Sequence, residues 1–137
     1  MTRAALGDAM IEVVPALRRF VPPAAVVDKF VYSPWLTPAL EQQLREWETS
    51  TVVVTGGETD VCVLATVLGA IDRGFRVVVA EDAICSSSDE THDALVTLYG
   101  RRFSQQLTMM STDDLLREWP SDRVRATVRS VTAPMKV

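Results

Sequence analysis

Apolar residues along this chain fall into short continuous runs and into stripes with helical spacing. Short, continuous runs rich in β-branched side chains are typical of parallel strands that are covered on both faces. The chain has two of them, at 51–55 and 76–80, and a third apolar run, at 107–110, is also predicted to be a buried strand. A further stretch from Val26 to Tyr32 predicts another strand, with Val27, Lys29 and Val31 on one face, because side chains alternate along a strand.

Helices are expected between these runs, from apolar positions three or four residues apart or from capping residues. Their ranges are 38–48, 59–73, 87–99 and 112–118. Side chains that accept hydrogen bonds from backbone N–H groups mark the beginnings, and glycines mark two of the ends. The expected caps are Thr37, Thr59 with Asp60, Ser87 in a capping box with Glu90, and Thr112, and the expected ends are Gly74 and Gly100.

The alternation of apolar strands with helices predicts an α/β fold, in which a parallel sheet lies between two layers of helices. We expect one domain over residues 1–118 and a loose C-terminal tail over 119–137. In such sheets, ligands bind outside the carboxyl ends of the strands. The segment that follows the run at 51–55 lies at one of these ends and is the first place to look for chemistry.

Composition narrows the class of protein. The 137 residues carry 18 acidic and 14 basic side chains, a net charge of −4, which argues against nucleic acid or an anionic membrane as the main partner. No apolar run approaches the roughly 20 residues of a membrane span, and the N-terminus has no secretory pattern. Two cysteines make no disulfide framework, so we expect a cytoplasmic protein. One histidine, His92, makes no zinc site, so we expect a surface or capping role for it and no metal or cofactor.

Cys62 is the candidate for chemistry. It follows a β-branched run, two glycines and a capping segment, and it falls in the first turn of an apolar helix. A helix N-terminus stabilises negative charge and therefore favours the nucleophilic thiolate. The alternative is a buried structural cysteine. A phosphate-binding loop is disfavoured because the glycines match neither G-x-G-x-x-G nor the Walker pattern. Cys85 is interpreted as a bystander.

The most specific motif around Cys62 is Gly56-Gly57-Glu58-Thr59-Asp60-Val61-Cys62-Val63, and it is supported by residues 65–66, 70–74 and 81–83. These stretches resemble a known family, the isochorismatase-like cysteine hydrolases. Residues 27–33 look like the family's strand that carries the catalytic lysine. Residues 88–92 are similar to its segment of small, acidic and histidine residues. The resemblance covers residues 7 to 116.

The resemblance implies a site and a reaction. Cys62 would be the nucleophile and Lys29 would stabilise its thiolate. The peptide bond between Gly57 and Glu58 would be cis, and the N–H groups of Glu58 and Cys62 would face a developing oxyanion. The family includes nicotinamidases and carbamoyl amidohydrolases. We therefore expect a cysteine-dependent hydrolase that cleaves an amide or ureido C–N bond of a small molecule through a thioester.

The chain departs from the family at the general base, an Asp at the end of the family's first strand. No segment of this sequence matches that strand or its Asp. Asp8, Glu12 and Asp28 are the candidates, although Asp28 precedes Lys29 and the two side chains would point to opposite faces of a strand. We therefore expect an isochorismatase-like sheet that lacks its first strands.

Missing strands favour an alternative function and pairing with another chain. A sheet edge without a neighbour tends to pair, so a homo-oligomer is expected. The alternative to an enzyme is a catalytically inactive remnant or an interaction subunit. Trp35 and Trp47 are expected to be packing residues, and Trp35 is also a weak candidate for the substrate pocket because it follows the lysine stretch.

Overall fold

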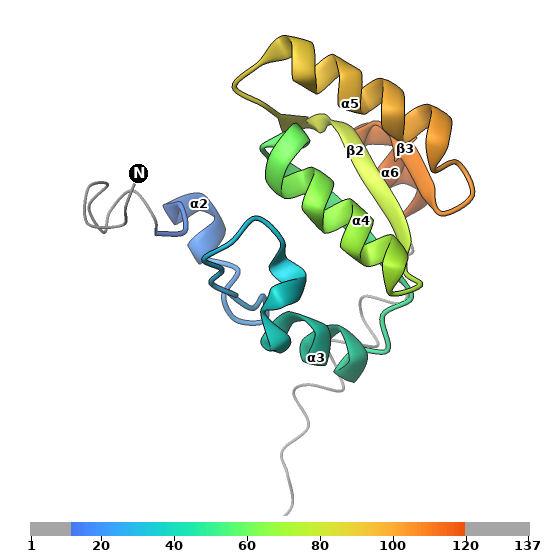
Figure 1. Cartoon of the computed structure of the whole chain (residues 1–137). Coiled ribbons are helices and arrows are strands. Elements are labelled where there is room, and N and C mark those ends of the chain that lie inside the picture. Colours follow the sequence, from blue (N-terminus) through green and yellow to red (C-terminus); the bar gives the residue numbers. More distant parts are fainter. Residues whose placement is uncertain (1–11, 120–137) are drawn as a thin grey trace, which may run out of the picture. The chain divides into compact units, whose positions relative to one another are not determined.

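The structure, a computed structural model, describes residues 12–119 (Figure 1). The chain divides into two compact units, whose described parts are residues 12–27 and 28–119. The first contains a short helix, α2 (Pro15–Arg18), with proline at its first position. The second contains the described sheet with its helices and the candidate site. Residues 120–137, expected to form most of the tail, lie outside the described residues.

The sheet within residues 28–119 has three parallel strands in the order β1 (Thr51–Gly57), β2 (Arg76–Cys85) and β3 (Leu107–Met110). The predicted α/β fold with a parallel sheet is confirmed. The limits of β3 match the prediction, whereas β1 and β2 extend further than their apolar runs. Their pairing continues past a shift in register, after which Gly56 faces Ile84 and Gly57 faces Cys85. The polar residues Glu81 and Asp82 conceal this continuation in the sequence.

The strand predicted over Val26 to Tyr32 is wrong, since this segment is irregular. A strand requires a neighbour that supplies backbone hydrogen bonds. Among the described residues, β1 pairs only with β2, and no strand pairs with this segment. Phe30 and Tyr32 remain 86% and 68% exposed. The sequence has the alternating pattern of a strand, but no strand of the described sheet pairs with it. Lys29 therefore lies on an irregular segment.

The predicted helices are present, the one over 112–118 with the predicted limits and the others with shifted ones. Their described ranges are α3 (Pro38–Glu46), α4 (Leu64–Asp72), α5 (Asp89–Arg102) and α6 (Thr112–Glu118). A 3-10 turn, η2 (Pro34–Leu36), precedes α3, and a π-helical turn, η3 (Thr59–Val63), precedes α4. Together η3 and α4 cover the range predicted as one helix. None of the helices in residues 12–119 is long and apolar enough to cross a bilayer.

Two predicted caps are wrong by one residue. The hydroxyl of Ser88, rather than Ser87, accepts the N–H of Thr91 at the start of α5. Ser111, rather than Thr112, accepts the N–H of Asp114 at the start of α6. In both places, neighbouring hydroxyl residues offer equivalent local caps, and side-chain partners elsewhere decide between them. The helix α5 also continues past Gly100, around which a methyl group would find open space.

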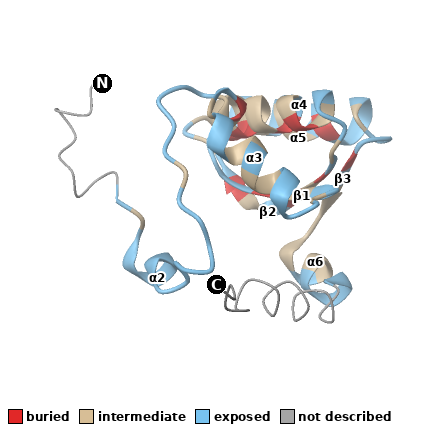
Figure 2. Ribbon diagram, turned by 90° about the horizontal axis from the view of Figure 1, so that it is seen from below, coloured by how far each residue is buried: buried red, intermediate tan, exposed pale blue. Residues whose placement is uncertain are grey.

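The core lies between the sheet and the helices α4 and α5, which cover one face, while α6 lies on the opposite side (Figure 2). Val77 and Val79 of β2 alternate inward and are completely buried, as are Val67 and Ala70 of α4. Tyr99 of α5 closes the same cluster. The side chains Leu40 and Leu44 of α3 pack against its margin. The predicted arrangement, with helices on both faces of the sheet, is therefore confirmed.

Asp82 of β2 holds the beginning of α6, and this contact predicts a pH dependence. Its carboxylate accepts hydrogen bonds from the hydroxyl of Thr112 at 2.7 Å and from the N–H of Thr112 at 2.8 Å. These bonds, the hydroxyl first, hold the pKa of Asp82 below its ordinary value of 3.8. The resulting stabilisation is present above that value and is lost as pH falls through the lower pKa of the folded state.

We expect Asp82→Asn to lower the urea midpoint of unfolding at pH 6. The difference from the wild type should shrink as the pH falls towards 3, because the wild-type carboxylate then becomes protonated. The matched control is Asp93→Asn on the exposed face of α5, whose effect should not depend on the Thr112 contact. A difference between wild type and Asp82→Asn that stayed constant over this pH range would contradict the assignment.

Candidate active site

Cys62 lies where the chain leaves the carboxyl end of β1 and enters η3. Two glycines make this entry possible. Gly56 has φ +103°, a conformation that side chains disfavour. A Cβ on Gly57 would lie 3.2 Å from the carbonyl oxygen and 3.3 Å from the Sγ of Cys85, tighter than an ordinary contact. The peptide bond between Gly57 and Glu58 is cis. Cys62 itself is half-buried in the turn that follows.

Lys29 and Cys62 meet although they lie 33 positions apart in the sequence. The Nζ of Lys29 donates to the Sγ of Cys62 at 3.4 Å and to the carbonyl oxygen of Val31 at 3.0 Å. An ammonium group at this distance stabilises a negative sulfur, with an energy that solvent reduces because Lys29 is exposed. Two residues predicted to lie in the site are thus brought together, which is the first requirement for an activated thiol.

The backbone of the turn is fixed by the carbonyl oxygen of Glu58. This oxygen accepts the N–H groups of Val61 at 3.1 Å and of Val63 at 3.0 Å, on both sides of Cys62. The carboxylate of Glu58 accepts the hydroxyl of Ser87 at 2.9 Å. Gly57, Glu58 and Cys62 therefore occupy one short, hydrogen-bonded segment, as the sequence motif predicts.

Thr59 and Asp60 do not cap the helix, which corrects the prediction. The residue before the turn is Glu58, and no side chain accepts a capping bond there. Thr59 is completely buried, and its hydroxyl shares a hydrogen bond of 2.9 Å with the Nδ1 of His92. Its carbonyl oxygen accepts the hydroxyl of Tyr99 at 3.0 Å. Thr59 therefore bonds to α5, and Asp60 bonds to the loop before α5, instead of to their own helix.

His92 and Tyr99 brace the turn from α5. The predicted surface or capping role of His92 is wrong, because the side chain is half-buried against Thr59. Burial, with a smaller contribution from the negative charge of Asp60, raises the pKa of Tyr99 to about 12. The phenol therefore keeps its proton and stays a hydrogen-bond donor. A spacing of seven residues places His92 and Tyr99 on one helical face, a pattern that could have identified both in the sequence.

Asp60 is engaged by the loop that precedes α5. Its carboxylate accepts a hydrogen bond from the hydroxyl of Ser86. This bond is the largest of the effects that hold the pKa of Asp60 below its ordinary value. Asp60 therefore remains ionised beside the turn that carries Cys62. Ser86, which sequence reasoning did not select, and Ser87, which it selected only as a helix cap, thus bind Asp60 and Glu58 of the motif.

None of the three candidates for a general base forms a hydrogen bond with Cys62 among the described residues. Asp8 lies outside the described residues. Glu12 pairs with Arg18 within its own unit. Asp28 takes part in no side-chain hydrogen bond or ion pair between described residues. Across residues 12–119, no cluster of three or more histidine, cysteine or acidic side chains could hold a metal ion.

Trp35 belongs to the core and not to a pocket. It is 6% exposed, and its Nε1 donates to the carbonyl oxygen of Thr66 in α4 at 2.8 Å. Its predicted packing role is confirmed, and its assignment as a pocket candidate is wrong. The other tryptophan, Trp47, is 44% exposed at the end of α3.

Fold and site together define a parallel α/β protein with a cysteine and a lysine in contact at the carboxyl end of a strand. The family model for the isochorismatase domain matches residues 1–112. The chain therefore belongs to the isochorismatase family.

Relatives and solved structures agree with this assignment. The chain is 38% identical over 66 residues to an uncharacterised isochorismatase family protein, PncA, of Bacillus subtilis, an alignment covering 48% of this chain and 36% of that protein. It is 33% identical over 103 residues to isochorismatase domain-containing protein 2 of Homo sapiens, covering 74% and 48%. The crystal structure of nicotinamidase/pyrazinamidase PncA from Bacillus subtilis matches at TM-score 0.62 and 27% identity, over 69% of this chain and 52% of that chain. The chain thus spans about half or less of these relatives.

We expect Lys29→Met to slow alkylation of Cys62 by iodoacetamide at neutral pH by about tenfold, because removing the ammonium removes its stabilisation of the thiolate. Peptide mapping by mass spectrometry separates the two cysteines, and Cys85 serves as the internal control whose rate should not change. Equal rates at Cys62 in the wild type and the variant would show that the contact does not activate the thiol.

We expect Tyr99→Phe to lower the free energy of unfolding by about 1 kcal/mol, because a buried hydrogen bond to the carbonyl oxygen of Thr59 is lost. The measurement is urea denaturation followed by circular dichroism. Tyr32→Phe is the matched control, since Tyr32 is exposed and its hydroxyl makes no hydrogen bond with a described residue. An unchanged midpoint for Tyr99→Phe would contradict the bracing role of α5.

Proposed function

We propose that this protein is a cysteine-dependent hydrolase that cleaves the C–N bond of a small amide or ureido compound. The observation that carries the proposal is the contact of 3.4 Å between the Nζ of Lys29 and the Sγ of Cys62, at the carboxyl end of β1. Membership of the isochorismatase family supports a hydrolase, and a matching structure described as a nicotinamidase/pyrazinamidase supports an amide substrate.

The proposed reaction uses the thiolate of Cys62 as the nucleophile. The sulfur attacks the carbonyl carbon, a C–S bond forms, and the carbonyl π electrons move to the oxygen. The N–H groups of Glu58 and Cys62 would stabilise this oxyanion. Collapse of the intermediate breaks the C–N bond, and the amine leaves with a proton. Water then hydrolyses the thioester to release the carboxylic acid and regenerate the thiol.

The leaving amine needs a proton, and the attacking water must lose one, so a carboxyl group completes the proposal. The described contacts of Cys62 are with Lys29 and with its own helical segment. We propose that this carboxyl group comes from outside the described residues or from another chain, with Asp8 as a candidate in this sequence. Neither metal nor cofactor takes part in these steps.

A second function is favoured by the edge of the sheet. Among the described residues, β1 has only β2 as a neighbour, and the segment that carries Lys29 exposes Phe30 and Tyr32. An open strand edge and exposed aromatic side chains favour association with another chain. The alternative proposal is thus a subunit without catalysis that acts by association, and a homo-oligomer is the proposed assembly in either case. A stable monomer in analytical ultracentrifugation would count against both the subunit function and the homo-oligomer.

Release of ammonia from nicotinamide, pyrazinamide and a panel of small amides and ureido acids tests the enzyme. We expect Cys62→Ala to lower turnover at least about a thousandfold, because the covalent route is lost. Cys85→Ala is the matched control and should retain activity. Intact mass spectrometry of the wild type with a slow substrate should show an acyl adduct on Cys62. Unchanged hydrolysis by Cys62→Ala would refute the proposed mechanism.

A further inference from the structure

The segment that carries Lys29 has no strand partner among the described residues, so something else must hold Lys29 at Cys62. We infer that Trp35 is the positioning residue for this contact and that Gly69 forms the slot in α4 that receives it. The inference deepens the proposed function, on which the role of the Lys29–Cys62 contact rests. It is argued from contacts within residues 28–119.

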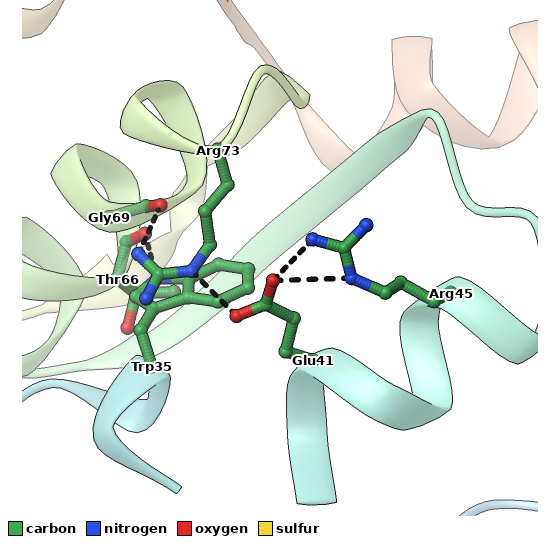
Figure 3. A network of polar contacts seen from close by, with 6 residues as sticks. All are labelled: Trp35, Glu41, Arg45, Thr66, Gly69 and Arg73. Carbon is green, nitrogen blue, oxygen red and sulfur yellow. Dashed lines mark hydrogen bonds and ion pairs between the residues drawn. The ribbon is translucent and has the colours of Figure 1, made fainter. Parts of the chain in front are cut away.

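The indole of Trp35 is fixed by contacts of several kinds (Figure 3). Its Nε1 donates to the carbonyl oxygen of Thr66 at 2.8 Å. Its ring stacks on Phe75, with 5.5 Å between ring centroids and 22° between ring planes. The guanidinium of Arg73 lies over the same ring, 5.0 Å from its centroid. A hydrogen bond, a stacked ring and a cation together define one position for this side chain.

Gly69 leaves the space into which the indole fits. A Cβ at this position would lie 2.1 Å from the Cδ1 and 2.7 Å from the Nε1 of Trp35, closer than any Cβ can approach. Glycine weakens the interior of a helix relative to alanine. Close approach of Trp35 explains why α4 carries glycine here, and a single added methyl group would displace the indole.

Helix α3 holds the cation over the ring. Glu41 of α3 accepts a hydrogen bond from the Nε of Arg73 at 3.1 Å, and Arg73 donates to the carbonyl oxygen of Gly69 at 3.1 Å. The hydrogen bonds from Arg45 and then Arg73 hold the pKa of Glu41 below its ordinary value, so this carboxylate stays charged. Arg73 is thereby kept flat against Trp35, as Figure 3 shows.

The same helical segment links Trp35 to the nucleophile. Thr66 receives the indole N–H through its carbonyl oxygen, and its hydroxyl donates to the carbonyl oxygen of Cys62 at 2.7 Å. Trp35 follows Lys29 by six positions, a tether of at most about 20 Å. Because Thr66 bonds both to the indole and to Cys62, fixing the indole restricts the region beside Cys62 that Lys29 can occupy. Trp35 acts through Lys29 and has no contact with the reacting atoms in this assignment.

Alkylation rates of Cys62 in a double-mutant cycle test the inference without any substrate. Gly69→Ala is made in the wild type and in Lys29→Met, and each rate is measured at neutral pH with Cys85 as the internal reference. We expect Gly69→Ala to slow Cys62 about tenfold in the wild type, like Lys29→Met. In the Lys29→Met background it should cause no further slowing, because the positioned ammonium is already absent.

Two further variants keep the test decisive. Gly100→Ala places the same methyl group in α5 where nothing lies within 4 Å, so Cys62 should react at the wild-type rate. Trp35→Phe retains an aromatic ring and removes the bond to Thr66, and it should slow Cys62 in the wild type only. If Gly69→Ala does not fold, Trp35→Phe takes its place in the double-mutant cycle. Slowing by the same factor with and without Lys29, or no slowing at all, would overturn the inference.

These outcomes are separate from those of the proposed function. A Lys29-dependent loss of reactivity in Gly69→Ala supports the positioning role even if no amide is hydrolysed. Conversely, hydrolysis that requires Cys62, together with a Gly69→Ala variant that alkylates at the wild-type rate, would support the enzyme and overturn the role of Trp35.

Discussion

The packing of α4 between the sheet and Trp35 is the constraint on which the rest of this structure depends. One side of the helix buries Val67 and Ala70 completely, against a sheet whose Val77 and Val79 are also completely buried. Burial of each such valine contributes on the order of 1.5–3 kcal/mol, so the position of the helix on the sheet is strongly determined. Because η3 leads directly into α4, this packing also determines where Cys62 lies.

The turn that carries Cys62 is held from a second direction by α5. Thr59 is buried between them, with His92 on its hydroxyl and Tyr99 on its carbonyl oxygen. A buried polar group of this kind is tolerated only when its hydrogen bonds are made. The nucleophile is thus supported by side chains from two helices, in keeping with the general requirement that a reactive group sit on a fixed frame. Lys29, in contrast, comes from an irregular segment, and its place depends on a neighbouring anchor.

The family assignment and the extent of the chain bear on function in different ways. Matching residues 1–112 to the isochorismatase domain establishes the family, and the fold and the Cys62 turn agree with it. The chain spans about half or less of the relatives compared with it, and the described residues bring Lys29 and Cys62 into contact. The source of the carboxyl group that the proposed reaction needs is therefore the question that separates the two proposed functions.

The sequence by itself determined the features that depend on neighbouring residues. Short apolar runs, two of them rich in β-branched residues, located the three strands of the described sheet. Gly56 and Gly57 marked the tight entry to the turn, and the motif around Cys62 identified the candidate nucleophile. These succeed because strand propensity and the conformational freedom of glycine are local properties. Local reasoning cannot decide which of two adjacent hydroxyl residues, such as Ser87 and Ser88, caps a helix.

Only the tertiary structure decided the features that need a distant partner. The pattern at 26–32 formed no strand because no described strand pairs with it. Trp35 is buried against α4 because Gly69 has no side chain to exclude it. Thr59 faces α5 because His92 and Tyr99 supply the hydrogen-bond partners of its hydroxyl and carbonyl oxygen. Strand pairing, close packing and buried hydrogen bonds each require two segments to meet, and where they meet is a property of the folded chain.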